Sequence, residues 1–204
     1  MKTILLTVFV FFASIAFADQ PGSPAKDGEL PLIASPSFEE PLDSSFSIAK
    51  GSWVPSNGIL TAAELPENKH VAVLHHDVGL RSAAIELEFR LDGSPAFLVG
   101  CDGKKGHIGR VIVKPTGVDI AEDSAKPSHV IATLKMPVAA NEWHKLRVDW
   151  KNDEMSATLD GQTVHGQHEY LATPKIHSWL AVPKSKTEIR NLTIRGEKTE
   201  AESK

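Results

Sequence analysis

Short runs in which apolar and polar residues alternate recur along the chain, whereas no segment keeps a helical period over three turns. Alternate residues of a strand point to opposite faces of a sheet, so these runs predict strands with one face in a core. In the run SAAIELEFRL the apolar side chains share one face: Ile85, Leu87, Phe89 and Leu91. The charged side chains of Glu86, Glu88 and Arg90 share the other face, which is expected to meet solvent.

The stretch NEWHKLRVDWKNDEMSATLDGQTV, residues 141–164, predicts three successive strands joined by tight turns. One face of its first run is expected to point into the core: His144, Leu146, Val148 and Trp150. The pair Asn152-Asp153 is expected to turn the chain after this run. The pair Asp160-Gly161, which suits positive φ, is expected to turn it again.

The remaining runs extend the same pattern to most of the chain. The segment HVIATLKM is expected to place four side chains on its inner face: Val130, Ala132, Leu134 and Met136. Other runs that fit short strands are GILTAAE, VAVLHH, AFLVG, IGRVIVK, GVDIA, KIHSWLAV and TEIRNLTIR. About a dozen short antiparallel strands on a chain of this length predict an all-β fold, a sandwich of two antiparallel sheets.

The two ends of the chain are expected to lie outside this sandwich. Residues 1–18 have the pattern of a cleaved signal peptide, because Lys2 precedes the apolar run ILLTVFVFF and the small-x-small triplet AFA follows. This apolar run is shorter than the roughly 20 residues of a membrane-spanning helix. We therefore expect a secreted or periplasmic protein with no membrane attachment after cleavage.

Composition divides the rest of the chain and excludes some partners. Residues 19–31 are expected to form a linker, residues 32–196 the sandwich domain, and residues 197–204 a disordered tail. The formal net charge is −4 and no stripe of Lys and Arg is present, so no nucleic acid partner is expected. Cys101 is the only cysteine, which excludes a disulfide scaffold, and its apolar surroundings predict a buried, unreactive thiol.

Several motifs resemble a known group in their order and spacing. The Trp-His pair above, the opening W-V-P-S-N-G-I-L and the late S-W-L-A-V…T-E-I-R-N-L-T-I-R resemble the concanavalin A-like jelly-roll superfamily. More narrowly, they resemble bacterial exported domains of the 3-keto-disaccharide hydrolase or family-16-like group. The run GHIGRVIVKPTGVDI is similar to the central strand pair of its planctomycete-type branch. The resemblance covers roughly residues 36–196 and implies a jelly roll with one concave sheet across which sugars lie.

The charged face of SAAIELEFRL is the first candidate site. Two neighbouring carboxylates, Glu86 and Glu88, could divide acid and base roles as glycosidases require. Family-16 hydrolases carry an E-x-D-x-E run, whereas here Arg90 stands at the third acidic position, which disfavours the retaining mechanism. The face is therefore interpreted either as a solvated surface with an internal Glu–Arg pair or as a polar surface that binds sugar.

The Gly-rich segment CDGKKGHIGR and one tryptophan supply the other candidates. Asp102 could accept hydroxyl protons from a sugar, and His107 and Arg110 could hold its hydroxyl or carboxylate groups. Trp143 lies out of phase with the core residue Trp150, so its ring could stack on a pyranose. The alternatives are an ordinary polar hairpin and plain packing of an indole at a sheet edge.

No metal and no organic cofactor are expected. Metal-ligand residue types cluster at four positions: His70, His75, His76 and Asp77. On a strand, however, His75 and His76 point to opposite faces and do not easily share one ion. No calcium-loop pattern is present either.

Three functional hypotheses remain. The leading one is an exported carbohydrate-binding domain that acts on extracellular or periplasmic glycans, with substrate contacts from Glu86, Glu88, Arg90, Asp102, His107, Arg110 and Trp143. The alternative is hydrolysis of a 3-keto-glycoside, as the resemblance implies, with Glu86, Glu88 or His107 as the base. The third is a protein-interaction module of the laminin-G kind. The sequence predicts no oligomeric state.

Cleavage after Ala18 would give a mature protein that begins at Asp19. We expect mass spectrometry of the exported protein to find this N-terminus. Retention of residues 1–18 would contradict the export hypothesis.

Overall fold

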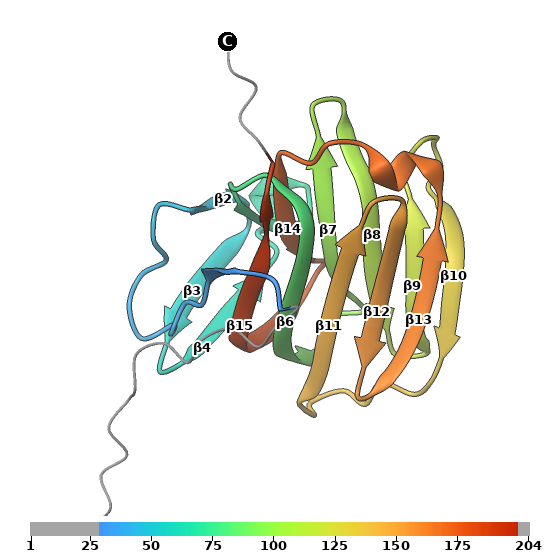
Figure 1. Ribbon diagram of the computed structural model, residues 1–204. Coiled ribbons are helices and arrows are strands. Elements are labelled where there is room, and N and C mark those ends of the chain that lie inside the picture. The colour runs from blue at the N-terminus through green and yellow to red at the C-terminus, as the bar shows by residue number, and fades with distance from the viewer. Residues whose placement is uncertain (1–28, 200–204) are drawn as a thin grey trace, which may run out of the picture.

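Residues 29–199 form two antiparallel sheets that pack face to face in the computed structural model (Figure 1). This confirms the all-β, two-sheet sandwich expected from the alternation. The expected signal peptide, most of the expected linker and the last five residues, 200–204, lie outside the described residues. No helix within residues 29–199 is long and apolar enough to cross a membrane.

The two sheets are called sheet A and sheet B. Sheet A has the order β13 (Gln162–Gln167), β12 (Glu154–Leu159), β11 (His144–Lys151), β6 (Leu80–Asp92), β15 (Lys186–Lys198), β4 (Ile59–Ala63) and β3 (Ser52–Ser56), and β1 (Leu32–Ala34) also pairs with β15. Sheet B has the order β10 (His129–Lys135), β9 (Gly117–Glu122), β8 (Gly106–Lys114), β7 (Phe97–Gly103), β14 (His177–Val182), β5 (Ala72–His76) and β2 (Phe46–Lys50). Two short 3-10 helices, η1 (Pro66–Asn68) and η2 (Glu169–Ala172), lie in the connections.

The apolar faces of the strands fill the space between the sheets. The expected inner residues of β6 and β11 are all buried: Ile85, Leu87, Phe89, Leu91, His144, Leu146, Val148 and Trp150. The rings of Phe89 from sheet A and Phe97 from sheet B stack with centroids 5.3 Å apart. Full burial of such a side chain stabilises the fold by about 1.5–3 kcal/mol. This burial determines which face of each strand points outward.

The Trp-His stretch folds into β11, β12 and β13 as expected. Its turns contain residues with positive φ, namely Asn152 (54°), Asp160 (47°) and Gly161 (84°). His144 points inward, where its Nδ1 donates to Asp160 Oδ2 at 2.7 Å and its Nε2 to the Ala139 carbonyl at 2.9 Å. Burial alone would lower the pKa of His144, but these two bonds outweigh it and raise the pKa. The histidine therefore ties the start of β11 to the next turn.

The inner face expected for β10 is wrong at its first residue. Val130 is exposed, whereas Ile131 packs against the core. The pairing of β10 with β9 shifts register between Val130 and Ala132. Such a β-bulge adds a residue to one strand and reverses the alternation beyond it. Alternation in the sequence alone does not reveal the bulge.

Residues just outside both expected domain boundaries contact the sandwich. At the N-terminal side, the Pro31 carbonyl accepts from the Gly196 backbone N–H at 2.9 Å, and Glu29 pairs with Arg195 at 3.1 Å. At the C-terminal side, β15 continues to Lys198. The chain is thus held to β15 from Glu29 onward, and β15 itself continues two residues past the expected boundary at 196.

The opposite orientations of the two tryptophans on and beside β11 give a test of the fold. Trp150 is 2% exposed in the core, and Trp150→Ala should cost about 3–5 kcal/mol in the free energy of unfolding. Trp143 is only partly buried on the outer face, and Trp143→Ala should cost clearly less. Urea denaturation of both variants measures the difference. Equal losses would contradict the assignment of inner and outer faces.

Candidate functional site

The outer face of sheet A carries the first predicted candidates, Glu86, Glu88 and Arg90. Arg147 on β11 donates to Glu86 and also to Asp149, from Nε at 2.8 and 3.0 Å and from Nη2 at 2.6 Å. This arrangement differs from the internal Glu–Arg pair that the sequence suggested, because the partner of Glu86 comes from the neighbouring strand.

Glu88 and Arg90 are likewise paired across strands. Glu88 accepts from Arg190 Nε at 2.8 Å and from Asn191 Nδ2 at 3.0 Å. Arg90 Nε donates to Glu188 at 2.8 Å. The hydrogen bonds from Arg190 and Asn191 lower the pKa of Glu88, whereas a glycosidase acid needs a raised pKa. This carboxylate is therefore suited to an ion pair and not to proton donation.

Trp143 points to the outer face of sheet A, as its phase predicted. The guanidinium carbons of Arg90 and Arg190 lie 5.0 and 4.1 Å from the centroid of its ring. Such cation–π contacts contribute about 0.5–1 kcal/mol at exposed sites. The arginines occupy the surface that a sugar would need, so the structure favours packing over stacking for this tryptophan.

The outer face of sheet B carries a different arrangement, centred on one carboxylate. Asp102, near the end of β7, accepts from Trp179 Nε1 at 2.6 Å and from His107 Nδ1 at 2.6 Å. It also accepts from His177 Nε2 at 3.1 Å. We call these four residues the Asp102 cluster. They come from three neighbouring strands, β8, β7 and β14.

Gly100 allows this cluster to form. It lies directly opposite Trp179 in the pairing of β7 with β14. A Cβ atom at Gly100 would come within 2.3 Å of the indole, so any larger residue would push the ring away. With glycine there, the indole lies across β7 and reaches Asp102. Trp179 is consequently 4% exposed and acts as a hydrogen-bond donor within the cluster.

The cluster keeps Asp102 charged. Burial raises the pKa of Asp102, but the hydrogen bonds from His107 and Trp179 outweigh burial and lower it. The same bond to Asp102 raises the pKa of His107. The His107 side chain is 52% exposed, and its Nδ1 is the nitrogen that faces Asp102. Its Nε2 is thus the nitrogen available to a ligand on this face.

Arg110 lies on the same face, one strand beyond Gly100. Its Nε donates to Asp123 at 3.1 Å and its Nη2 to Ser128 Oγ at 2.7 Å. Ser128 in turn donates to Asp123 at 2.6 Å. These contacts hold the guanidinium in place beside the Asp102 cluster.

The predicted site residues therefore fall on two opposite sides of the sandwich. Asp102, His107 and Arg110 lie together on sheet B. The other predicted residues lie together on sheet A: Glu86, Glu88, Arg90 and Trp143. The structure does not bring all seven together, because β6 and β7 belong to different sheets. His177 was missed, although the alternation in KIHSWLAV places it on the same face as Trp179.

A groove of about 490 Å³ borders the hairpin between β7 and β8. Lys104, Lys105 and Lys175 are among the described residues that line it. The Nζ of Lys175 donates to the carbonyls of Leu171 at 2.5 Å and Thr173 at 3.2 Å, and burial lowers the pKa of this lysine. The groove was not predicted, because it depends on the approach of the η2 connection to this hairpin.

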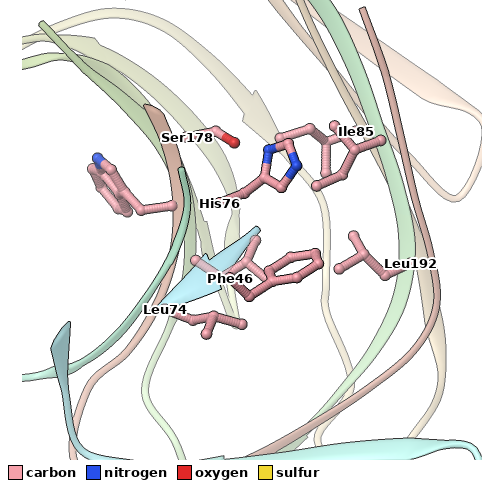
Figure 2. Close-up of a pocket in the computed structure, with 9 residues that line it drawn as sticks. Phe46, Leu74, His76, Ile85, Ser178 and Leu192 are labelled. Atoms are coloured by element: carbon pink, nitrogen blue, oxygen red, sulfur yellow. The ribbon is translucent and has the colours of Figure 1, made fainter. Parts of the chain in front are cut away.

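Two adjacent histidines of β5 point in opposite directions, as expected. His75 faces outward, and its ring stacks on that of His177 with centroids 4.2 Å apart. His76 faces inward beside a cavity of about 10 Å³ (Figure 2). Figure 2 shows its ring among apolar side chains that include Phe46 and Leu192. Within residues 29–199, neither ring nitrogen of His76 has a hydrogen-bond partner, and burial lowers the pKa of this histidine.

Solved structures resemble this sandwich. No protein-family model and no curated protein matches the chain. The carbohydrate binding module CBM66 from Bacillus subtilis aligns with a TM-score of 0.63 and 15% identity, over 74% of this chain and 96% of that one. The Crh5 transglycosylase in its apo form aligns with a TM-score of 0.58 and 13% identity, over 86% and 89%. These likenesses show the fold, a jelly-roll sandwich of two antiparallel sheets.

A third jelly roll aligns over most of the domain. The exoplasmic/lumenal domain of VIP36, in a form bound to Ca²⁺ and Man2, aligns with a TM-score of 0.57 and 8% identity, over 87% of this chain and 90% of that one. At these identities the likeness is one of fold. The narrower resemblance to the 3-keto-disaccharide hydrolase group stays a prediction.

The buried His76 should make the jelly roll sensitive to acid. An unfolded histidine takes up a proton below pH of about 6.5, whereas burial keeps His76 neutral in the folded state. The contribution of this residue to stability is therefore present above that pH and is lost as pH falls below it. We expect His76→Phe to gain stability relative to the wild type as pH falls from 8 toward 5. Urea denaturation across this range measures the gain.

His70→Gln is the matched control, because it removes an exposed imidazole and leaves the buried ring of His76 in place. The contrary outcome is a difference in the free energy of unfolding between His76→Phe and the wild type that stays constant from pH 8 to pH 5. That outcome would contradict the assignment of His76 as a histidine kept neutral by burial.

Proposed function

We propose that the outer face of sheet B binds carbohydrate around the Asp102 cluster. The observation that carries this proposal is the cluster itself, in which a charged carboxylate orients two imidazoles and an indole on one sheet face. Sugars present many hydroxyl groups, and imidazole nitrogens can donate to or accept from them. The names of the similar jelly rolls CBM66 and VIP36 with Man2 support this ligand class.

The contacts to the sugar would be mainly hydrogen bonds. His107 offers its Nε2 from a half-exposed ring, and Arg110 lies beside it. Trp179 is 4% exposed, so its ring is not open for stacking on a pyranose. The groove beside the β7–β8 hairpin would extend the surface toward Lys104 and Lys105. Together with the expected signal peptide, this surface supports our proposal of an exported domain that acts on extracellular or periplasmic glycans.

A second candidate is the hydrolysis of a 3-keto-glycoside, with His107 as the base. The Asp102–His107 pair favours it, because a carboxylate that accepts from Nδ1 fixes the tautomer with a free Nε2. Nε2 would take the proton from the carbon between the ketone and the anomeric carbon, and Asp102 would stabilise the resulting imidazolium. The electron pair of that C–H bond would form a double bond to the anomeric carbon as the glycosidic C–O bond breaks. The leaving oxygen would take the proton back from the imidazolium, and water would then add across the double bond to complete the hydrolysis. Of the three bases considered from the sequence, Glu86 and Glu88 are bound to arginines, which leaves His107.

Two variants on opposite faces test the proposal. In a glycan array, His107→Ala should weaken the binding of any bound glycan, because lost hydrogen bonds to a ligand cost about 1–3 kcal/mol, or about 5- to 150-fold in Kd. Glu88→Gln, the matched control on sheet A, should bind like the wild type. The melting temperature of His107→Ala should stay near that of the wild type, because the ring is half exposed.

A parallel assay for release of 3-keto sugar separates the two candidates. Turnover by the wild type that is lost in His107→Ala, with binding retained, would establish the hydrolase. Binding without turnover would establish the binding domain. Loss of binding in Glu88→Gln but not in His107→Ala would show that the ligand lies on sheet A.

A further inference from the structure

A second group of polar side chains lies on the outer face of sheet B, next to the Asp102 cluster. His75, Asp77 and His177 each bring one ligand atom, and these three atoms all lie within 4.8 Å of one another. His75 and His177 are half-buried, and Asp77 is exposed. The group therefore combines two imidazole nitrogens and one carboxylate oxygen at a place that solvent can reach.

The pairing of β5 with β14 brings these residues together. His75 and Asp77 are two positions apart and so point to the same side of the sheet. Trp179 pairs with His75 and Ser178 with His76, so the next position, His177, falls beside Asp77. The backbone N–H of Asp77 donates to the Ser45 carbonyl at 2.7 Å, which fixes the residue just after the strand ends.

We propose that His75, Asp77 and His177 form a binding site for a divalent transition-metal ion, with Zn²⁺ as the representative. Two imidazoles and one carboxylate are a ligand set typical of zinc and similar ions. Calcium and magnesium prefer sets made of oxygen ligands. No metal was expected here because the adjacent His75 and His76 point to opposite faces, whereas the second imidazole comes from β14.

The hydrogen bond between His177 and Asp102 is a second, independent observation that supports a metal site. Metal-binding histidines commonly donate their other ring N–H to a carboxylate, which fixes the tautomer and the orientation of the ring. His177 has this arrangement, since its Nε2 donates to Asp102 Oδ2 at 3.1 Å. Its Nδ1 is thereby the nitrogen that can bind an ion. Asp102 is itself held by Trp179 and His107, so the ring of His177 is positioned before any ion arrives.

The three ligand atoms need to move only slightly closer together to bind one zinc ion. Bonds of about 2.0–2.1 Å to a tetrahedral zinc ion place its ligand atoms about 3.3–3.4 Å apart. The three atoms lie within 4.8 Å, so side-chain rotations that move each by about 1 Å would close the set. Three protein ligands leave at least one position open to water or to an oxygen of a ligand on this face. The metal site goes beyond the proposed function and does not depend on it.

Titration of the purified protein with ZnCl₂ tests the site. The protein should carry no histidine tag, and isothermal titration calorimetry should be done without glycan, so failure here leaves the carbohydrate proposal untouched. We expect one equivalent of Zn²⁺ to bind with a Kd of micromolar order or tighter. His75→Ala and His177→Ala should each raise this Kd at least tenfold, and so should Asp77→Asn. An excess of Ca²⁺ or Mg²⁺ should not compete.

His165→Ala is the matched control, because His165 is an exposed histidine on sheet A. This variant should bind Zn²⁺ like the wild type. Substitution with Co²⁺ should give visible absorption bands of a low-coordinate site, and Asp77→Asn should change them. The absence of saturable Zn²⁺ binding by the wild type would overturn the proposal. Wild-type affinity in a folded His75→Ala/His177→Ala double variant, checked by circular dichroism, would overturn it too.

Discussion

Alternate residues of every strand are held between the two sheets, and this constraint decides where polar chemistry can occur. Side chains such as Leu87 and Val99 lose contact with water when the sheets pack, so their sequence neighbours must point outward. Polar groups that meet on an outer face therefore come from neighbouring strands. Glu88 lies opposite Arg190, and Asp102 lies opposite His177, in the pairing of their strands. The outer surfaces are consequently defined by the order of the strands.

The two outer faces use this geometry differently. On sheet A, carboxylates meet guanidinium groups, which stay charged at all physiological pH values and leave little unsatisfied hydrogen-bonding capacity. On sheet B, the carboxylate of Asp102 meets imidazoles, whose nitrogens can donate, accept or bind a metal. Two sheets of similar construction thus differ in the chemical groups that their outer faces offer to a ligand. The difference comes from the partners that neighbouring strands provide.

Sequence alone predicted the fold and the inner faces well, because both depend on the local period of two residues. It predicted that Glu86 and Glu88 face solvent, but not that Arg147 and Arg190 bind them, since cross-strand pairing is not a local property. The bulge before Ala132 was not predicted, for the same reason. In the candidate site, Asp102, His107 and Arg110 were found from residue type in one hairpin. His177 was not, because its role depends on the neighbourhood of β7 and β14.

Gly100, beneath Trp179, affects how far the charged carboxylate of Asp102 is exposed to water. Because no side chain stands at Gly100, the indole covers the strand and shields Asp102 from water. A position with no functional group of its own thereby limits how far Asp102 is exposed to water. Related chains with a bulkier residue at that point would present a wetter, more weakly organised carboxylate on the same fold. Ligand preference among such jelly rolls can therefore diverge through a residue that never touches the ligand.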